Sequence, residues 1–251
     1  MSAGKPKPTR RKKSPAARLR PFWIVIALVL VAAAAGGYYA ASWPGFHPAN
    51  VRVRGNAVVP TGEILSAAAI ARSQNVWLQN TRAAARRIEA IPYVATARVR
   101  RTPPANVLIV ITERVPYAVL RDGADRALVD RELRVLSNEP GSRTLPVFDV
   151  RVASAFTPGA FVRNAVARRL RDDYDALLAG HVIVSSLSYD RFGDLDATVR
   201  PGIRILFGDD VNLAKKIPLV DPILSQVARK GRPIRAIDLR AKSTPVIVYK
   251  K

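Results

Sequence analysis

The chain has 251 residues, of which 49% are hydrophobic and 24% are charged, a balance that indicates folded protein and excludes a disordered chain. The 41 Lys and Arg residues exceed the 19 Asp and Glu residues by a net charge of +22, which favours anionic surroundings such as nucleic acid, lipid headgroups or an acidic partner. With no cysteine and only two histidines, the chain cannot form a disulfide, a thiolate metal site, a cysteine nucleophile or a cluster of several histidines around a metal.

The N-terminal region combines a basic tail with a long apolar segment. Residues 1–21 are rich in Lys and Arg and contain no acid, so we expect a flexible tail. The segment 22–43 that follows has no charged residue, and roughly 33 Å of helix matches a hydrocarbon core of about 30 Å. Aromatic residues occupy its two ends, where interfacial belts lie in membrane helices, and the predicted anchor residues are Phe22, Trp23, Tyr38, Tyr39 and Trp43.

The basic tail orients this predicted transmembrane helix. The positive-inside rule puts the N-terminus in the cytoplasm and everything after the helix outside the inner membrane. Two alternatives stay open: a signal peptide cleaved near residues 40–42, and a twin-arginine signal built on Arg10 and Arg11.

The first exterior segment predicts a small α/β module. Residues 51–54 alternate as a strand, and helices follow at 61–71 and, after the N-cap Asn80, at 81–90. A hairpin of strands 94–101 and 106–113 completes the module. Two helices must then cover one face of a three-stranded sheet.

The remaining segment predicts a sheet with flanking helices. Short strands are expected at 118–120, 127–129 and 134–136, then a helix over 160–179 that Gly180 ends at a C′ position. Further strands are expected at 181–189, 195–200, 203–207, 236–239 and 246–249. A helix over 211–228 contains Pro218 and Pro222, so we expect it to be kinked or split.

Several strings in this order resemble one known family, and they are Val51 to Asn56, Ile91 to Val94, Ala97 to Arg101, Leu108 to Ile111, Glu113, Arg114, Pro116 and Ala118. Together they closely resemble the POTRA segment of the FtsQ/DivIB cell division proteins. Later strings, Leu206 to Gly208 and Ile237 to Arg240, resemble that family's β domain. The chain departs from the family at Val129-Asp130, because no glycine follows in the turn, and at the two prolines of the penultimate helix.

The resemblance implies an α+β fold. The expected parts are a cytoplasmic basic tail (1–21), a transmembrane helix (22–43), a POTRA domain of β-α-α-β-β order (47–115) and a mixed, mainly antiparallel β domain with flanking helices (116–251). The last strand of that domain is expected to bind a partner.

The function implied is that of a non-enzymatic scaffold without cofactor or metal. Such a protein sits in the inner membrane at the division septum, binds FtsB/FtsL-like partners and helps regulate septal wall synthesis. Other division membrane proteins are expected at the POTRA domain and anionic lipid at the basic tail, with no nucleic acid partner.

The resemblance also implies a partner-binding set of Arg191, Arg240, Ser243, Val246, Val248 and Tyr249. An unpaired strand edge offers N–H and C=O groups to an incoming strand. Simpler interpretations stay open: ordinary half-buried strand residues at 246–248, Arg240 paired with Asp238, and a solvated arginine patch made of Arg82, Arg86, Arg87, Arg98, Arg100 and Arg101.

Other functions find little support in the residues. The chain has no Gly-x-x-x-x-Gly-Lys phosphate loop, no Gly-x-Ser-x-Gly elbow and no His-Glu-x-x-His motif. An exterior wall-remodelling enzyme, a POTRA protein for outer-membrane assembly or secretion, and a nucleic-acid binder through the tail are the alternatives.

Overall fold

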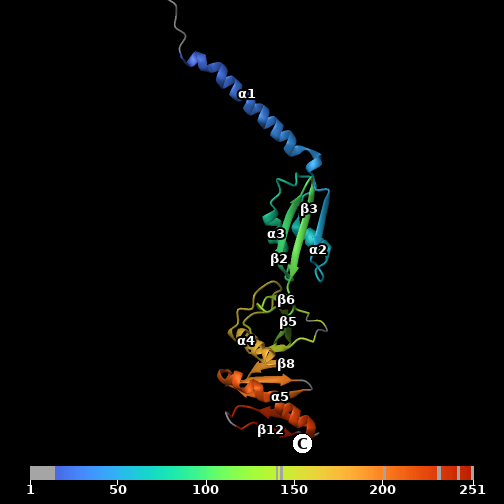
Figure 1. The fold of residues 1–251 in the computed structure, drawn as a ribbon, viewed down its shortest axis with the longest axis vertical. Coiled ribbons are helices and arrows are strands. Elements are labelled where there is room, and N and C mark those ends of the chain that lie inside the picture. The colour runs from blue at the N-terminus through green and yellow to red at the C-terminus, as the bar shows by residue number, and fades with distance from the viewer. Residues whose placement is uncertain are drawn as a thin grey trace, which may run out of the picture.

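The computed structural model describes residues 15–139, 141, 144–199, 202–230, 233–241 and 244–249, with side chains from Phe22 onward except Asp210 and Lys230. One long helix leads into a three-stranded unit, which is followed by a nine-stranded unit (Figure 1). The helices are α1 (Pro15–Ser42), α2 (Thr61–Ala68), α3 (Thr81–Glu89), α4 (Ala165–Ala179) and α5 (Leu213–Lys230), with 3-10 turns η1 (Pro44–Phe46) and η2 (Asp210–Asn212). The strands are β1 (Asn50–Arg54), β2 (Val94–Thr102), β3 (Asn106–Glu113), β4 (Ala118–Asp122), β5 (Asp125–Val129), β6 (Val135–Ser137), β7 (Val147–Asp149), β8 (Val184–Tyr189), β9 (Leu195–Val199), β10 (Ile203–Gly208), β11 (Ile234–Asp238) and β12 (Val246–Tyr249).

The apolar helix α1 is long enough to cross a membrane by length and composition. Its candidate span is Phe22–Ser42, 21 residues with a mean hydropathy of 2.1, and none of it is buried against the rest of the chain. The aromatic side chains at both ends are exposed, including Trp23 and Tyr38. The helix begins at Pro15, earlier than the predicted start, because proline suits the first helical position and the Ala, Leu and Arg residues after it favour helix.

The three-stranded unit has the predicted β-α-α-β-β order. Its sheet runs β1-β3-β2, with β1 parallel and β2 antiparallel to the central β3. The helices α2 and α3 cover one face, and Ile64, Ile88 and Ile109 are fully buried between helices and sheet. Helix α2 ends before its predicted end, because Ala69 adopts a left-handed conformation with φ 47°.

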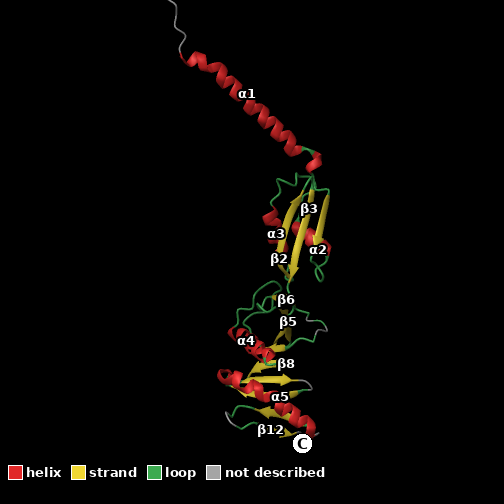
Figure 2. Cartoon of the chain, viewed as in Figure 1, coloured by secondary structure: helices red, strands yellow, loops and turns green. Residues whose placement is uncertain are grey.

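The nine-stranded sheet is mixed and mainly antiparallel, as predicted, in the order β12-β11-β10-β9-β8-β7-β4-β5-β6. Helices α4 and α5 pack with it around one core that contains Phe148, Leu187 and Phe207 (Figure 2). The strand β7 was missing from the prediction. It lies parallel to both neighbours, β4 and β8.

Helix α4 corrects two expectations. It begins at Ala165 instead of residue 160, because the Asn164 side chain accepts a hydrogen bond from the Ala167 N–H at 3.0 Å and caps the helix. Gly180 is not left-handed, with φ −85°, and His181 takes that conformation instead, with φ 61°. Glycine is still required at 180, because a Cβ there would lie 2.1 Å from Ile217 Cγ2.

The penultimate helix was expected to be kinked or split, and it is not split. Helix α5 is continuous through Pro218 and Pro222. Its inner face buries Leu213, Ile217 and Val220 in the core of the nine-stranded unit. This packing outweighs the loss of backbone hydrogen bonds at the two prolines.

Candidate protein-binding edge

One edge of the nine-stranded sheet is formed by the last strand, β12. It pairs antiparallel with β11, in a register that sets Val246 opposite Asp238 and Val248 opposite Ala236. Among the residues that the structure describes, no strand pairs with the other side of β12. Its outward N–H and C=O groups therefore face no strand of the described chain.

The opposite edge, at β6, is covered by the chain itself. The Gly159 N–H donates to the Val135 carbonyl at 2.8 Å, and the Val135 N–H donates to the Ala160 carbonyl at 2.9 Å. A bridge between Arg134 and Phe161 extends this pairing. The contrast singles out β12, because exposed strand edges are usually protected unless they bind something.

The side chains of β12 divide between two faces. Val246 and Val248 are 52% and 41% exposed on the face away from the helices. Ile247 and Tyr249 pack against the core. The structure thus puts Tyr249, a predicted partner contact, partly on the core side of the strand.

Arg240 follows β11 and pairs with its nearest acid, as one interpretation of the sequence held. Its guanidinium donates to both carboxylate oxygens of Asp238, with a closest N–O distance of 2.6 Å. These bonds hold the pKa of Asp238 below its usual range, against the opposing effect of burial. The Arg240 side chain is 53% exposed, so its outer surface stays accessible beside the edge.

Arg191 lies in the turn between β8 and β9, with its guanidinium 4.6 Å from the Phe192 ring centroid. The Asp190 carboxylate accepts backbone N–H groups of this turn, which lowers the pKa of Asp190 and fixes the loop. The strand registers place Arg191 at the same end of the sheet as Arg240 and Val246, but three strand spacings, about 14 Å, separate β9 from β12. Ser243 lies outside the described residues.

The contact between the two sheet units was not foreseen from the sequence. Arg114, at the end of β3, binds Asp130 at 2.5 Å and Glu132 at 2.7 Å. Burial alone would lower the pKa of Arg114, but these two carboxylates raise it. Arg134 donates in return to the Glu89 carbonyl at 3.1 Å. Asp130 belongs to the turn after Val129, in which the sequence has no glycine. Leu133 adopts the left-handed backbone conformation in this turn, with φ 63°.

The predicted arginine patch is divided by the fold. Arg87 binds the carbonyls of Ala67 and Ala68 on the helix side of the three-stranded sheet. Arg98 and Arg100 are exposed on the opposite, helix-free face. The six arginines therefore do not form one surface.

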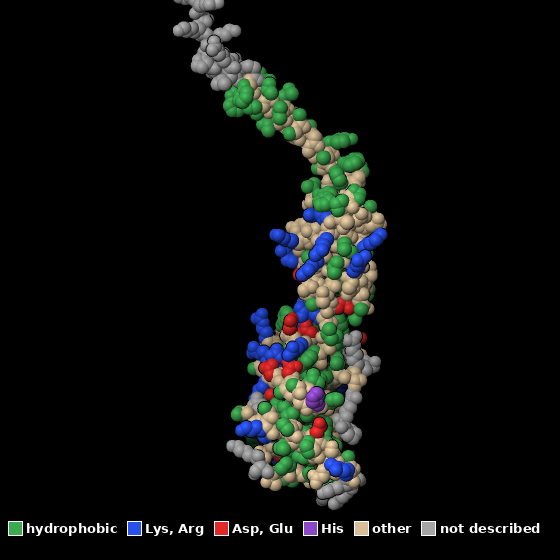
Figure 3. All heavy atoms as spheres, viewed as in Figure 1, with side chains coloured by type: hydrophobic (Ala, Val, Ile, Leu, Met, Phe, Trp, Pro, Cys, Tyr) green, Lys and Arg blue, Asp and Glu red, His purple; other side chains and the backbone are tan. Residues whose placement is uncertain are grey.

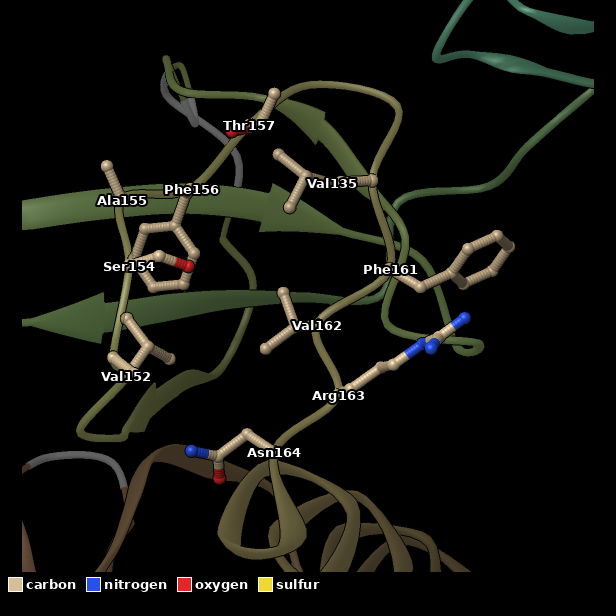
Figure 4. Close-up of a pocket in the computed structure, with 12 residues that line it drawn as sticks. Val135, Val152, Ser154, Ala155, Phe156, Thr157, Phe161, Val162, Arg163 and Asn164 are labelled. Carbon is tan, nitrogen blue, oxygen red and sulfur yellow. The ribbon is translucent and has the colours of Figure 1, made fainter.

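The pocket in Figure 4 lies between β6 and the loop before α4. Its lining is mostly apolar, including Val135, Phe156 and Val162. The side chain of Asn164, at the border of the pocket, already forms hydrogen bonds within the protein. Its oxygen caps α4, and its nitrogen donates to the Arg151 carbonyl. Within the described residues, no group of three or more His, Cys, Asp or Glu side chains could hold a metal ion.

Comparison with known proteins agrees with this architecture. The family profile described as "POTRA domain, FtsQ-type" matches residues 46–114. The chain is 31% identical over 201 residues to "Cell division protein FtsQ" of Mycolicibacterium smegmatis, covering 80% of this chain and 58% of that protein. It is 26% identical to the protein of that name from Mycobacteroides abscessus, covering 91% and 70% of the two chains. It is also 22% identical to "Cell division protein DivIB" of Clostridium tetani, covering 82% and 81%.

Proposed function

The chain belongs to the FtsQ/DivIB family of cell division proteins, and from this premise we propose that it is a non-enzymatic, membrane-anchored scaffold of the division machinery. In this proposal α1 crosses the inner membrane with the basic N-terminus in the cytoplasm. The POTRA domain (47–115) and the β domain (116–251) then lie outside, at the septum, and help regulate septal wall synthesis.

The main support for the proposal is the outer edge of β12, which pairs with no strand of the described chain. A partner of FtsB/FtsL type adds a strand to this edge through main-chain hydrogen bonds. The exposed Val246 and Val248 give apolar contact beside it, and the outer surface of Arg240 offers positive charge to an acidic partner residue. Arg191, at the same end of the sheet, is a further proposed contact, and Ser243 stays a proposed contact from the sequence alone.

The POTRA domain offers a second docking place for other division membrane proteins. Strand β2 is an edge strand of the three-stranded sheet, and with nine residues it is longer than β12. Part of this edge is already occupied, because the Ala97 N–H donates to the Glu89 carboxylate at 2.9 Å. We therefore assign the primary partner to β12.

Copurification of the full-length chain with the FtsB-type protein of the same cell tests the proposal. The variant Val248→Asp places a charge on the exposed face of β12, and we expect it to lose the partner. The matched control Val115→Asp changes a valine that is 78% exposed and lies shortly before the strand β4, which is six strands away from β12 in the sheet order, and it should retain the partner. Equal recovery of the partner with both variants would refute docking at β12.

A further inference from the structure

A tight turn of the POTRA domain, residues 75–78, is hydrogen-bonded to the last turn of α1. The Asn75 side chain donates to the Ala41 carbonyl at 3.1 Å, and its own oxygen accepts the Trp77 N–H at 2.9 Å. The Val76 N–H donates to the Phe46 carbonyl at 2.9 Å. Ala41 belongs to the last turn of the candidate span, so the proposed crossing of the bilayer by α1 puts this turn at the depth of the membrane–water interface.

This turn exposes two large apolar side chains. Leu78 is 72% exposed and Trp77 is 43% exposed, although Asn75 and Val76 beside them are buried. Arg101 holds the turn in shape, because it donates to the carbonyls of Val76 and Gln79 and lies 5.9 Å from the Trp77 ring centroid. The exposure is therefore built into the fold.

Four arginines line the helix-free face of the adjacent sheet in two cross-strand rows. Arg52 and Arg100 flank Leu108, and Arg54 and Arg98 flank Val110. All four are exposed, and no carboxylate of the described chain forms an ion pair with any of them. Figure 3 shows Lys and Arg side chains gathered over this unit, next to the hydrophobic side chains at the end of α1.

We propose that this membrane-facing end of the POTRA domain binds the outer surface of the bilayer that α1 crosses. Trp77 and Leu78 enter the interfacial layer, and Arg52 and Arg100 contact anionic lipid headgroups. Trp favours this layer because its ring is amphipathic, and basic residues near an anionic surface contribute to binding. A lipid surface fits better than an acidic protein, because the bond to Ala41 keeps the turn at the bilayer whatever else binds.

The two arginine rows differ in their distance from the membrane. Trp77 donates to the Pro104 carbonyl in the β2–β3 turn, so this turn marks the membrane end of the sheet. Arg100 precedes the last residue of β2 by two positions, about 7 Å, whereas Arg98 lies about 13 Å away. With a screening length of about 8 Å at physiological salt, the row of Arg52 and Arg100 interacts with headgroups roughly twice as strongly as the other row.

The test uses the full-length chain, which contains no cysteine, in vesicles of phosphatidylcholine with or without phosphatidylglycerol. A fluorophore on Leu78→Cys reports contact with nitroxide-bearing lipids by quenching. The control label on Val115→Cys sits at a side chain that is 78% exposed, beyond the far end of β3, and the two ends of that strand lie about 24 Å apart. We expect quenching at 78 and not at 115, and stronger quenching when phosphatidylglycerol is present.

Neutralising the near row in the double variant Arg52→Gln/Arg100→Gln should remove the increase in quenching at position 78 that phosphatidylglycerol causes. Each arginine is expected to contribute about fivefold to the ratio of lipid-bound to lipid-free POTRA domain. The matched pair Arg54→Gln/Arg98→Gln should lose much less, about twofold for each arginine. Equal quenching at positions 78 and 115, or equal losses in the two pairs, would overturn the proposal. The proposal rests on anchoring by α1, which vesicle flotation of the same samples tests separately: chain that does not float would refute the anchor itself.

Discussion

Replacing Gly55 by alanine should destabilise the POTRA domain strongly. Gly55 directly follows β1 and has φ +89°, a conformation that costs an alanine about 1–2 kcal/mol. The added Cβ would also lie 2.1 Å from the Ile111 carbonyl oxygen in β3, so a backbone segment must move, at a further cost of about 1–3 kcal/mol. The expected loss is about 3 kcal/mol, a large part of the stability of a unit of this size.

Hydrogen exchange of the β3 amides in the full-length chain measures this loss. Where exchange requires the domain to open, about 3 kcal/mol corresponds to roughly 150-fold faster exchange. The control Gly62→Ala has open space around its Cβ and an ordinary φ in α2, so exchange should be unchanged or slower. Similar exchange rates in the Gly55→Ala and Gly62→Ala variants would refute the steric reasoning.

Three further results are expected. The Glu113 carboxylate accepts hydrogen bonds from the N–H groups of Ala57, Val58 and Val59. Burial alone would raise the pKa of Glu113, but these hydrogen bonds bring it below the usual value. The bonds therefore stabilise the 57–59 loop above about pH 4.3, and this stabilisation is lost as the pH falls through the lowered pKa. Exchange protection of that loop, corrected for intrinsic rates, should fall on acidification in the parent and not in Glu113→Gln, and identical pH profiles would contradict this. Asn164→Ala should lower the free energy of unfolding by about 1 kcal/mol, measured in denaturant, and Asn164→Ser should restore most of it if the N-cap is responsible. A double-mutant cycle of Arg114→Met and Asp130→Asn should give a coupling energy of about 1–3 kcal/mol, and additive effects would exclude a stabilising ion pair between the two sheet units.

The sequence was informative wherever a local signal matched the fold. Alternation predicted β1 and the β2–β3 hairpin, and Asn80 correctly predicted the start of α3, where its side chain accepts the Ala83 N–H at 3.0 Å. Uninterrupted apolar character predicted the long helix α1. These signals act over a few neighbouring residues, so a single sequence carries them.

Features that depend on distant contacts were missed or misplaced. Packing keeps α5 continuous through two prolines, and Phe161, which has helical spacing with later apolar residues, pairs instead with Arg134. The requirement for glycine at 180 comes from Ile217, a distant residue of α5. No local pattern encodes such contacts.

The candidate edge was predictable only as a strand. Alternation indicated β12, but its place at the end of the sheet follows from the pairing of nine strands, and the covering of β6 by residues 159–162 appears only in three dimensions. The same holds for the arginine rows, since Arg52 and Arg100 are far apart in sequence and become neighbours through β3.

Strand addition at β12 is tested by hydrogen exchange of the last strand in the full-length chain, with and without the proposed FtsB-type partner. Strand addition predicts that amides within residues 246–249 become strongly protected when the partner binds, because their outward N–H groups gain acceptors. Partner binding that leaves exchange in these residues unchanged and protects another surface would refute strand addition at β12.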